Sequence, residues 1–341
     1  MNNDITVLVT GASGFVGMHC ILLLLEKGYR VKGTVRSLAK ADHLRKILQQ
    51  HSQHTDRLEL VEADLMQDAG WAEAVSGCRY VLHVASPFPS STPKNEDDLI
   101  IPAREGTLRV LRAAHQAGVQ RLVLTSSVAA ISAGHEPGNK TYDESDWSNL
   151  NGPIEAYPKS KTLAEKAAWD YINQPDVAME LVAINPSLIL GPVLDARQTS
   201  TSAEVILKLL KREYPGMPRL NWGIVDVRDV AAAHVAAMTS PEAAGKRFVC
   251  SSGSLWLVEI AKILNQHFAS QGYKVPTWQL PDFAVRLAAL FDPTVKLVVG
   301  GLGQETRLSN QRLKSILDLP QFSPEDAVVA TGQSVIDLKV V

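Results

Sequence analysis

The sequence predicts an α/β protein, a doubly wound parallel sheet with a smaller, mostly helical C-terminal domain. Two observations carry this prediction. In the first half of the chain, short apolar segments alternate strictly with longer amphipathic ones. The short segments are apolar throughout instead of at every second residue, which is typical of strands buried on both faces. Strands and helices that alternate in this way form a parallel sheet with helices on both faces, because the crossovers are right-handed.

The predicted elements follow in order from the N-terminus. Residues 5–9 are rich in β-branched side chains and end at Thr10 and Gly11, which predicts a buried strand. Residues 15–27 have helical spacing, with Gly28 as the stop signal. The other predicted strands of this half are residues 30–35, 58–61, 80–84, 121–125 and 180–184. The other predicted helices are residues 38–50, 71–75, 105–117 and 156–172.

The alternation is lost after Asn185 and Pro186. Four segments with helical spacing follow, separated by loops rich in proline and glycine, at residues 203–211, 230–238, 257–268 and 283–290. We therefore expect residues 1–185 to form the sheet domain and residues 186–341 a second domain, interleaved with the first. The second domain should lie near the C-terminal ends of the strands, where sheets of this kind bind ligands.

The composition excludes several classes of protein. Among 341 residues, 34 Lys and Arg nearly balance 36 Asp and Glu, so neither nucleic acid nor a membrane surface is an expected partner. Cys20, Cys78 and Cys250 are far apart and predict buried thiols in place of a disulfide framework or a zinc site. No histidine spacing indicates a metal, and no apolar run reaches the ~20 residues that cross a bilayer. We expect a soluble cytoplasmic protein; the composition leaves the oligomeric state open.

A glycine-rich turn joins the first predicted strand to the first predicted helix. Gly11 permits the tight turn, Gly14 lets the backbone approach a pyrophosphate, and Gly17 lets the helix pack closely on the sheet. The N–H groups that begin the helix are free to bind an anion. Such glycines also occur in plain strand-to-helix turns, but here the flanking elements match a βαβ unit. Residues 1–185 are therefore predicted to form a dinucleotide-binding Rossmann domain.

The end of the second predicted strand indicates the type of dinucleotide. Proteins that bind NAD place Asp or Glu there, whereas this chain has Arg36 and, one helical turn on, Lys40. A guanidinium binds a 2′-phosphate with two hydrogen bonds, so the sequence favours NADP(H). Asp64 and Leu65 end the third strand, where the adenine would lie; Asp64 alternatively caps the following turn.

Tyr157 and Lys161 lie four residues apart at the start of a predicted helix, on one side of a helical turn. A lysine ammonium near a phenol favours the phenolate and lowers the pKa of the phenol. A tyrosine in that setting is able to exchange a proton with a carbonyl oxygen. Pro158 places Tyr157 at the first edge of the helix. An exposed amphipathic face would give the same spacing, but the glycine turn upstream favours the catalytic interpretation.

Eight motifs together resemble those of the extended short-chain dehydrogenase/reductases, in the branch of dihydroflavonol, cinnamoyl-CoA and aldehyde/ketone reductases. They occur in family order and span residues 5–240. They are TGASGFVG (10–17), VRS (35–37), ADL (63–65), HVASP (83–87), LTSS (124–127), YPKSK (157–161), NPSLILGP (185–192) and VDVRDVAAAH (225–234).

The resemblance implies a catalytic triad of Ser127, Tyr157 and Lys161, with Ser126 as the alternative serine. Ser127 would donate a hydrogen bond to the substrate carbonyl, and Tyr157 would donate the proton. Lys161 would also hold the nicotinamide ribose. The positions implied to bind the cofactor are Gly11, Ser13, Gly14, Phe15, Val16, Gly17, Arg36, Lys40, Asp64, Leu65, Ala85, Ser86, Thr125, Tyr157, Lys161, Pro186, Ser187 and Leu188.

The sequence thus predicts an NADPH-dependent reductase that converts a ketone or aldehyde to an alcohol. The first alternative is a sugar-nucleotide epimerase, or a steroid- or sugar-type dehydrogenase, on the same fold. Epimerases resemble one another in an Asn at the position of Leu188, and the apolar residue here suits a less polar substrate. The second alternative is a non-catalytic NADP-sensing protein, against which the complete triad argues. Two further residues have simpler expected roles: His83 as a hydrogen-bonded core residue, and Asp229 as the cap of the helix beginning at Val230.

Overall fold

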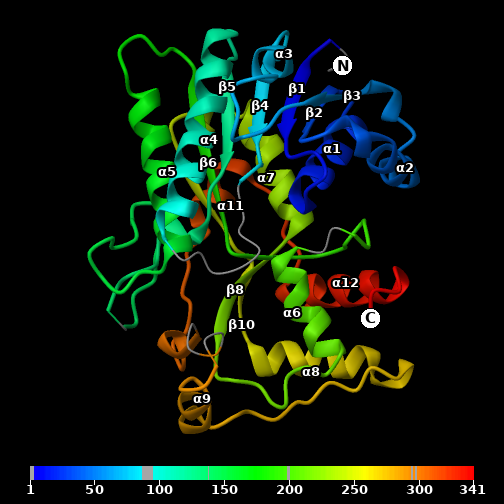
Figure 1. Ribbon diagram of the computed structural model, residues 1–341, viewed down its shortest axis with the longest axis vertical. Helices are drawn as coiled ribbons and strands as arrows, with labels where there is room; N and C mark the ends of the chain where they lie inside the picture. The colour runs from blue at the N-terminus through cyan, green and yellow to red at the C-terminus, as the bar shows by residue number, and fades with distance from the viewer. Residues whose placement is uncertain (1–3, 87–94, 137, 198–199, 293–294, 296–297) are drawn as a thin grey trace.

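The computed structural model describes residues 4–86, 95–136, 138–197, 200–292, 295 and 298–341, with the side chain of Lys40 left out. Its main sheet has seven parallel strands in the order β3-β2-β1-β4-β5-β6-β9 (Figure 1). The strands are β1 (Thr6–Thr10), β2 (Arg30–Val35), β3 (Leu58–Glu62), β4 (Tyr80–His83), β5 (Arg121–Thr125), β6 (Glu180–Pro186) and β9 (Arg247–Cys250). The predicted doubly wound parallel sheet is confirmed.

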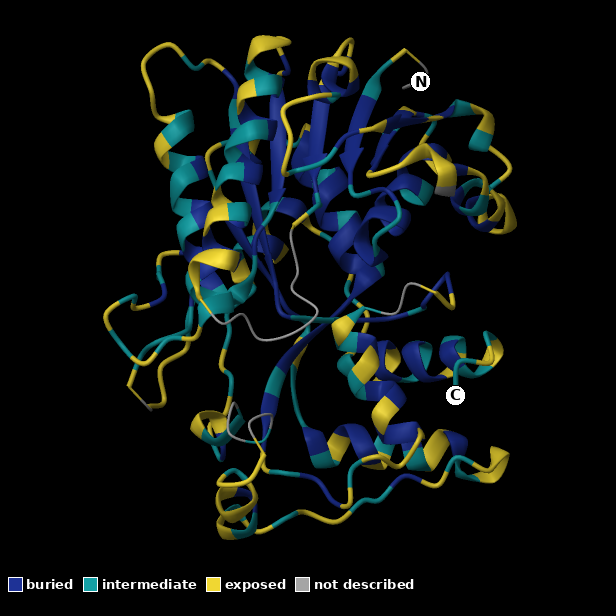
Figure 2. Ribbon diagram, in the orientation of Figure 1, coloured by how far each residue is buried: buried dark blue, intermediate teal, exposed yellow. Residues whose placement is uncertain are grey.

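Helices cover both faces of the sheet because neighbouring strand residues point to opposite sides. Val7 and Val9 pack with α1 (Phe15–Glu26) and α7 (Val227–Thr239), whereas Leu8 packs with the helices of the other face. Those helices are α3 (Trp71–Val75), α4 (Asp97–Gln116) and α5 (Ala156–Ile172). Figure 2 shows the strands as the most deeply buried part of the molecule. Burial on both faces explains why the strands are apolar throughout.

Most predicted boundaries agree with the structure to within one or two residues. The exception in the first half is α4, which begins at Asp97, eight residues before the predicted start, and contains Pro102. Proline is disfavoured inside a helix and is usually found in the first turn, so the sequence did not indicate a helix that begins before Pro102. The helix α2 (Ala41–His51) follows a short 3₁₀ turn, Leu38–Lys40.

In its described part, the chain beyond residue 185 contains the four predicted helices, and also two helices and a small sheet that the sequence did not reveal. The predicted helices are α6 (Thr201–Leu210), α7, α8 (Leu257–Phe268) and α9 (Asp282–Ala288), whereas α11 (Gln311–Leu317) and α12 (Pro324–Asp337) were not predicted. The sheet has the order β10-β8-β7, from β7 (Leu188–Leu190), β8 (Asn221–Asp226) and β10 (Gly253–Trp256). The three residues of β7 carry too little pattern to be recognised, and β8 and β10 lie outside the alternation of strands and helices that marks the main sheet.

The same part of the chain also contributes to the main sheet, since β9 pairs with β6 and α7 covers β6 and β5. The chain therefore returns to the first domain after leaving it. The division at residue 185 stays a prediction. In Figure 1 the C-terminal ends of the main strands face the middle of the molecule, where the chain passes into β7, β8 and α6.

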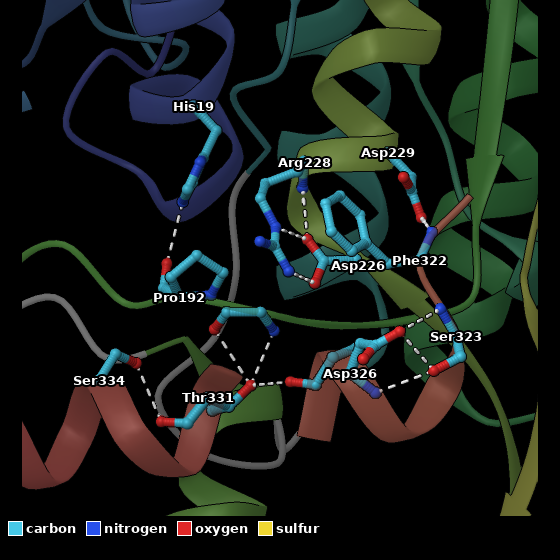
Figure 3. Close-up of polar contacts among 12 residues, drawn as sticks. His19, Pro192, Asp226, Arg228, Asp229, Phe322, Ser323, Asp326, Thr331 and Ser334 are labelled. Carbon is cyan, nitrogen blue, oxygen red and sulfur yellow. Dashed lines mark hydrogen bonds and ion pairs between the residues drawn. The ribbon is translucent and has the colours of Figure 1, made fainter. Parts of the chain in front are cut away.

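The C-terminal helix α12 is fixed to the loop that follows β7 (Figure 3). Thr331 Oγ1 accepts a hydrogen bond from the Gly191 N–H at 2.7 Å and donates one to the Gly191 carbonyl at 3.0 Å. Ser334 Oγ accepts from the Val193 N–H at 2.9 Å. Because Thr331 is fully buried, these bonds exclude water and fix α12 against the loop.

A second contact in Figure 3 corrects the role expected for Asp229. The helix α7 begins at Val227, and its cap is Asp226, whose carboxylate accepts from the Arg228 N–H at 2.8 Å. Asp229 is instead buried and accepts from the Phe322 N–H at 3.0 Å, on the segment that leads into α12. The sequence did not show which of the two residues is the cap, because Asp226 and Asp229 are both acidic and lie close together, and the exact ends of a helix are hard to predict.

Asp229 should make the stability of this protein depend on pH. Burial raises the pKa of Asp229 to about 7, and the charge of Asp226 adds to the effect. The folded state therefore keeps a proton that the unfolded chain releases, so stability falls as the pH rises from about 4 to about 7. Asn at this position still accepts the Phe322 hydrogen bond but carries no charge. We expect Asp229→Asn to raise the free energy of unfolding by about 1–2 kcal/mol at pH 8 and by clearly less at pH 5. Thermal unfolding at both pH values measures this difference. If the substitution changes the free energy of unfolding equally at pH 5 and pH 8, the titration of Asp229 is not the cause.

Candidate active site

The glycine turn between β1 and α1 has the geometry that the sequence predicts. Gly11 has a φ of +70°, and a Cβ there would lie 3.1 Å from the Cα of Ala85, which follows β4. A Cβ on Gly17 would lie 2.2 Å from the Gly11 carbonyl oxygen, so only glycine lets α1 approach the turn. Gly14 caps α1, and no side chain bonds to the N–H groups of its first turn. These N–H groups have no partner within the helix and suit an anion.

A cleft of about 610 Å³ lies along this turn and the ends of β2, β3 and β4. Its lining includes these predicted cofactor-binding residues: Gly11, Ser13, Gly14, Phe15, Val16, Arg36, Asp64, Leu65, Ala85 and Ser86. Ile189, Ser200 and Ser202 line it as well and were not predicted. They come from the chain beyond β6, so no local pattern connects them with the glycine turn.

A second cavity of about 460 Å³ surrounds the exposed side of Arg36. His43 and Arg197 line it, together with Ser13 and Ser37. His43 Nε2 lies 2.8 Å from the carboxylate of the buried Asp195, and Arg197 contacts the other ring nitrogen of His43. No local pattern indicated Arg197, because it lies 154 residues after His43 along the chain. The side chain of Lys40 lies outside the described residues.

Asp64 caps the turn after β3, which is one of its two expected roles, and its contact with the adenine stays a prediction. Its Oδ1 accepts from the Met66 N–H at 2.9 Å, which fixes the turn after β3. The residue also lines the larger cleft, beside Leu65. The turn therefore presents Asp64 to the cleft in one fixed orientation.

Tyr157 lies at the second position of α5, as Pro158 predicted. Its side chain forms a hydrogen bond with that of Ser127. Ser127 is the second residue after β5, and its Oγ accepts from the Ala129 N–H at 3.1 Å, which fixes the hydroxyl. One turn along α5, Lys161 donates from Nζ to Ser86 Oγ at 3.0 Å, while Nζ lies 6.0 Å from the centre of the Tyr157 ring. The ends of β4 and β5 and the start of α5 therefore converge on one point.

The protonation of this cluster differs from the expectation in one respect. Burial raises the pKa of Tyr157, and the group that opposes this effect is the Ser127 hydroxyl. Burial also lowers the pKa of Lys161 to about 8, against the carboxylate of Glu165, which raises it. The sequence argument considered only the attraction between the ammonium and the phenolate. Enclosure acts in the opposite sense because it disfavours both charged forms.

The two adjacent serines after β5 have different environments. Ser126 is buried, and its Oγ donates to the carboxylate of Glu165 at 2.5 Å, away from Tyr157. Ser127 is only half-buried and is the serine bonded to Tyr157. This geometry favours Ser127 as the residue that meets a substrate.

Several predicted cofactor-binding residues lie beside the larger cleft but not in its lining. Thr125 lines a smaller cavity with Ser86 and Lys161, and its Oγ1 lies 2.6 Å from His234 Nε2. The Ser187 N–H donates to the Cys250 carbonyl at 3.0 Å. Gly17, Pro186 and Leu188 belong to α1, β6 and β7. The assignment of these five residues to a cofactor stays a prediction, as does that of the residues that line the cleft.

Other expectations concern residues with no role in the site. His83 is fully enclosed and lies 2.8 Å from Thr10 Oγ1, and burial lowers its pKa to about 3, so the predicted core role is confirmed. Cys20, Cys78 and Cys250 are buried free thiols, as predicted. Among the described residues, no group of three or more His, Cys, Asp or Glu could hold a metal ion. None of the helices in the described ranges is long and apolar enough to span a membrane.

A glycine turn at the first strand of a doubly wound sheet, with Ser, Tyr and Lys converging beside it, defines a dinucleotide-dependent oxidoreductase. The sequence profile of the NAD dependent epimerase/dehydratase family matches residues 7–251, and the chain belongs to this family.

Relatives with known names place the chain among the reductases of this family. A putative anthocyanidin reductase of Ginkgo biloba is 37% identical over 80% of this chain and 82% of its own length. Cinnamoyl-CoA reductase 1 of Petunia hybrida is 35% identical over 91% of this chain and 86% of its own length. The solved structure of Gre2 from Candida albicans in complex with NADPH has a TM-score of 0.81 and 31% identity, and covers 98% of this chain and 99% of that one. Yeast methylglyoxal/isovaleraldehyde reductase Gre2 with NADPH also has a TM-score of 0.81, at 28% identity and the same coverage.

Proposed function

We propose that this protein is an NADPH-dependent carbonyl reductase that converts a ketone or aldehyde to an alcohol by a Ser-Tyr-Lys mechanism. The observation that carries the proposal is the hydrogen bond from Lys161 Nζ to Ser86 Oγ at 3.0 Å, because Ser86 lines the cleft that also holds the glycine turn and Arg36. Lys161 lies one turn from Tyr157, whose side chain bonds to that of Ser127, so this contact connects the three proposed catalytic residues with the cleft. The relatives named above are reductases, which supports the same reaction class.

The residues of the cleft fit NADPH. The pyrophosphate would lie on the free N–H groups at the start of α1, where Gly11 and Gly14 leave room for it. Arg36 would bind the 2′-phosphate, and Arg197 adds a second guanidinium to the same cavity. A cation pair of this kind favours NADPH over NADH, because NADH has no phosphate there. When bound, NADPH supplies the hydride that reduces the carbonyl carbon.

The chain supplies the proton and holds the carbonyl oxygen. Ser127 would donate a hydrogen bond to that oxygen, because its hydroxyl is already fixed by the Ala129 N–H. Tyr157 would pass its phenolic proton to the same oxygen as negative charge develops on it. Lys161, protonated at neutral pH, would stabilise the phenolate that remains.

An apolar surface on the substrate side supports a carbonyl compound with a hydrophobic body over a sugar nucleotide. Leu188 and Ile189 are half-buried at the edge of the cleft region, and Trp222 lies on the strand beside them. Trp222 also packs on a cluster of Leu220, Val285 and Leu302, so the chain beyond residue 240 supports this wall. Trp147 and Phe88 also lie in segments that, from the sequence, could line the substrate pocket. The Trp147 ring stacks instead on the guanidinium of Arg247 at 3.8 Å, and Phe88 lies outside the described residues.

A panel of aliphatic, aryl and β-keto ester carbonyls, followed by the loss of NADPH absorbance, tests the proposal. We expect turnover with at least one class, and with NADPH in clear preference to NADH. NADPH binding without oxidation across the panel would favour the sensor alternative. Interconversion of a sugar nucleotide without net oxidation of NADPH would favour the epimerase.

The cellular setting belongs to the proposal as well. The three free thiols support a reducing compartment such as the cytoplasm, since oxidising compartments favour disulfides. The proposed partner is the small-molecule carbonyl substrate alone. Sedimentation of the purified protein would give its oligomeric state, which the sequence leaves open.

A further inference from the structure

The carboxylate of Glu165 lies at the centre of a buried polar network behind the candidate active site. Glu165 is 1% exposed and lies on α5, one turn beyond Lys161. It accepts hydrogen bonds from Ser126 Oγ at 2.5 Å and from Asn185 Nδ2 at 2.8 Å. Arg247 donates to both of its oxygens, from Nε at 2.6 Å and from Nη2 at 3.2 Å. A single carboxylate therefore joins α5 to β5, β6 and β9.

Two of these contacts, those with Ser126 and Asn185, reach residues next to the proposed reacting groups. Ser126 immediately precedes Ser127, which is bonded to Tyr157. Asn185 also donates to the Ser127 carbonyl oxygen at 3.1 Å and immediately precedes Pro186, at the expected nicotinamide end. Lys161 and Glu165 share one side of α5 and line one small cavity with Ser126. A shift of Glu165 would therefore move Ser127 relative to Tyr157 and Lys161.

We propose that Glu165, held by Arg247, is a positioning residue for the reductase reaction, which fixes Ser127 against Tyr157 and keeps Lys161 in its charged form. The inference rests on the proposed function. It assigns a role to two charged residues that do not touch the substrate or the cofactor.

Fold stability alone is a weak explanation for this ion pair. Both side chains are almost fully buried, since the exposed fraction of the side chain is 0% for Glu165 and 8% for Arg247. The cost of removing two charges from water commonly cancels their attraction, so apolar residues of similar volume serve a core equally well. Two hydrogen bonds of Glu165, however, hold Ser126 and Asn185, which immediately precede Ser127 and Pro186 of the candidate site. A positioning role accounts for the choice of these two partners.

The charges around Lys161 explain the electrostatic part of the proposal. Enclosure lowers the pKa of Lys161 to about 8, and Glu165 is the charged group that opposes this effect. The other groups near the pair are Tyr157 on α5, His83 on β4, Arg247 on β9 and Thr107 on α4. Burial keeps His83 neutral, because its pKa falls to about 3. Loss of the Glu165 charge would therefore leave Arg247 as an unbalanced cation and release the proton of Lys161 at lower pH.

The test compares Glu165→Gln with the wild type in two measurements. In the cofactor-free protein, reductive ¹³C-methylation and NMR titration report the pKa of Lys161, with Lys161→Met used to assign its signal. We expect Glu165→Gln to lower this pKa by about 0.5–1.5 units. In the reductase assay, the pH at which kcat declines on the alkaline side should fall by a similar number of units. At pH 7, kcat itself should fall about tenfold or more. The NADPH Kd should stay within about threefold, because no contact of the cleft is removed.

Glu165→Asp separates charge from position. It keeps the negative charge but withdraws the carboxylate by one methylene from Ser126 and Asn185. We expect the pKa of Lys161 to stay near the wild-type value while kcat still falls severalfold.

Glu144→Gln is the matched control. Glu144 is also a buried carboxylate beside β9, where it accepts from the Val249 N–H at 3.0 Å, and Arg247 donates to its carbonyl oxygen. It makes no contact with Ser126, Asn185 or α5 among the described interactions. We expect a lower melting temperature with an unchanged Lys161 titration and an unchanged pH profile.

If Glu165→Gln does not fold, the double variant Glu165→Gln/Arg247→Met serves in its place, because it leaves no unpaired buried charge. A wild-type Lys161 titration in either variant overturns the electrostatic part of the proposal. Wild-type kcat at pH 7 overturns the positioning part. Since the titration requires neither substrate nor cofactor, it gives an answer even if the reductase function itself is disproved.

Discussion

Tyr157→Phe should lower kcat for carbonyl reduction by about 10²–10⁴-fold, because it removes the proposed proton donor. The ring remains, so packing at the start of α5 is retained, while the hydrogen bond to Ser127 is lost. NADPH should bind with a Kd within about threefold of the wild-type value. Initial rates of NADPH oxidation and titration of NADPH fluorescence measure the two quantities.

Tyr171→Phe is the matched control for this substitution. Tyr171 lies on the same helix, and its hydroxyl is 3.0 Å from His115 Nδ1, on α4. The same atom is removed, but far from Ser127 and Lys161. We expect kcat within about twofold of wild type. If Tyr157→Phe also retains most of kcat, Tyr157 is not the proton donor.

Arg36→Ala should weaken NADPH binding and leave NADH binding almost unchanged. A charge-assisted contact of a guanidinium with phosphate is worth about 1.5–3 kcal/mol, which corresponds to roughly 10–150-fold in Kd. The effect should depend on the 2′-phosphate alone, because the lining of the cleft that would receive the pyrophosphate is unchanged. Fluorescence titration with the two nucleotides gives the ratio directly.

Lys46→Ala is the control for the loss of one positive charge. Lys46 is exposed on α2, a helix close to Arg36, but it lines neither cavity. We expect no change in the preference for NADPH. A change in preference below about tenfold for Arg36→Ala would mean that Arg36 is not the main phosphate contact. Arg197→Ala would then be the next variant, since Arg197 lines the same cavity.

The confirmed part of the fold follows from patterns confined to short stretches of chain. The strand at Arg121–Thr125 and the helix at Ala156–Ile172 have the predicted bounds, because their apolar spacing is set by burial against one layer of neighbours. The glycine turn was recognisable because each glycine meets a local steric demand, such as the approach of Gly17 to the Gly11 carbonyl. Three-residue β7 and the β10-β8-β7 sheet were missed because such short strands depend on their partners.

The candidate site likewise contains residues that local patterns predict and residues that they do not. Tyr157 and Lys161 were predicted from their spacing on one helix, and Arg36 from its position at the end of a strand. The pKa of Tyr157 was predicted to be lowered by Lys161, whereas burial raises it, since the sequence does not show how far a phenol is enclosed. No sequence pattern indicated that Arg197 lies in the same cavity as Arg36, or that Arg247 pairs with Glu165, because the members of each pair are separated by many residues.

The sequence by itself determined the doubly wound sheet, the glycine turn and the residue types that exchange a proton and bind a phosphate. These depend on interactions between residues close together in the chain, or on the repetition of one element type. Only the tertiary structure decided which serine faces Tyr157, which caps hold α7 and α12, and which charges surround Lys161. Those choices depend on burial and on contacts between distant strands, and the free energy of a charge is fixed by its enclosure, which no short segment of sequence encodes.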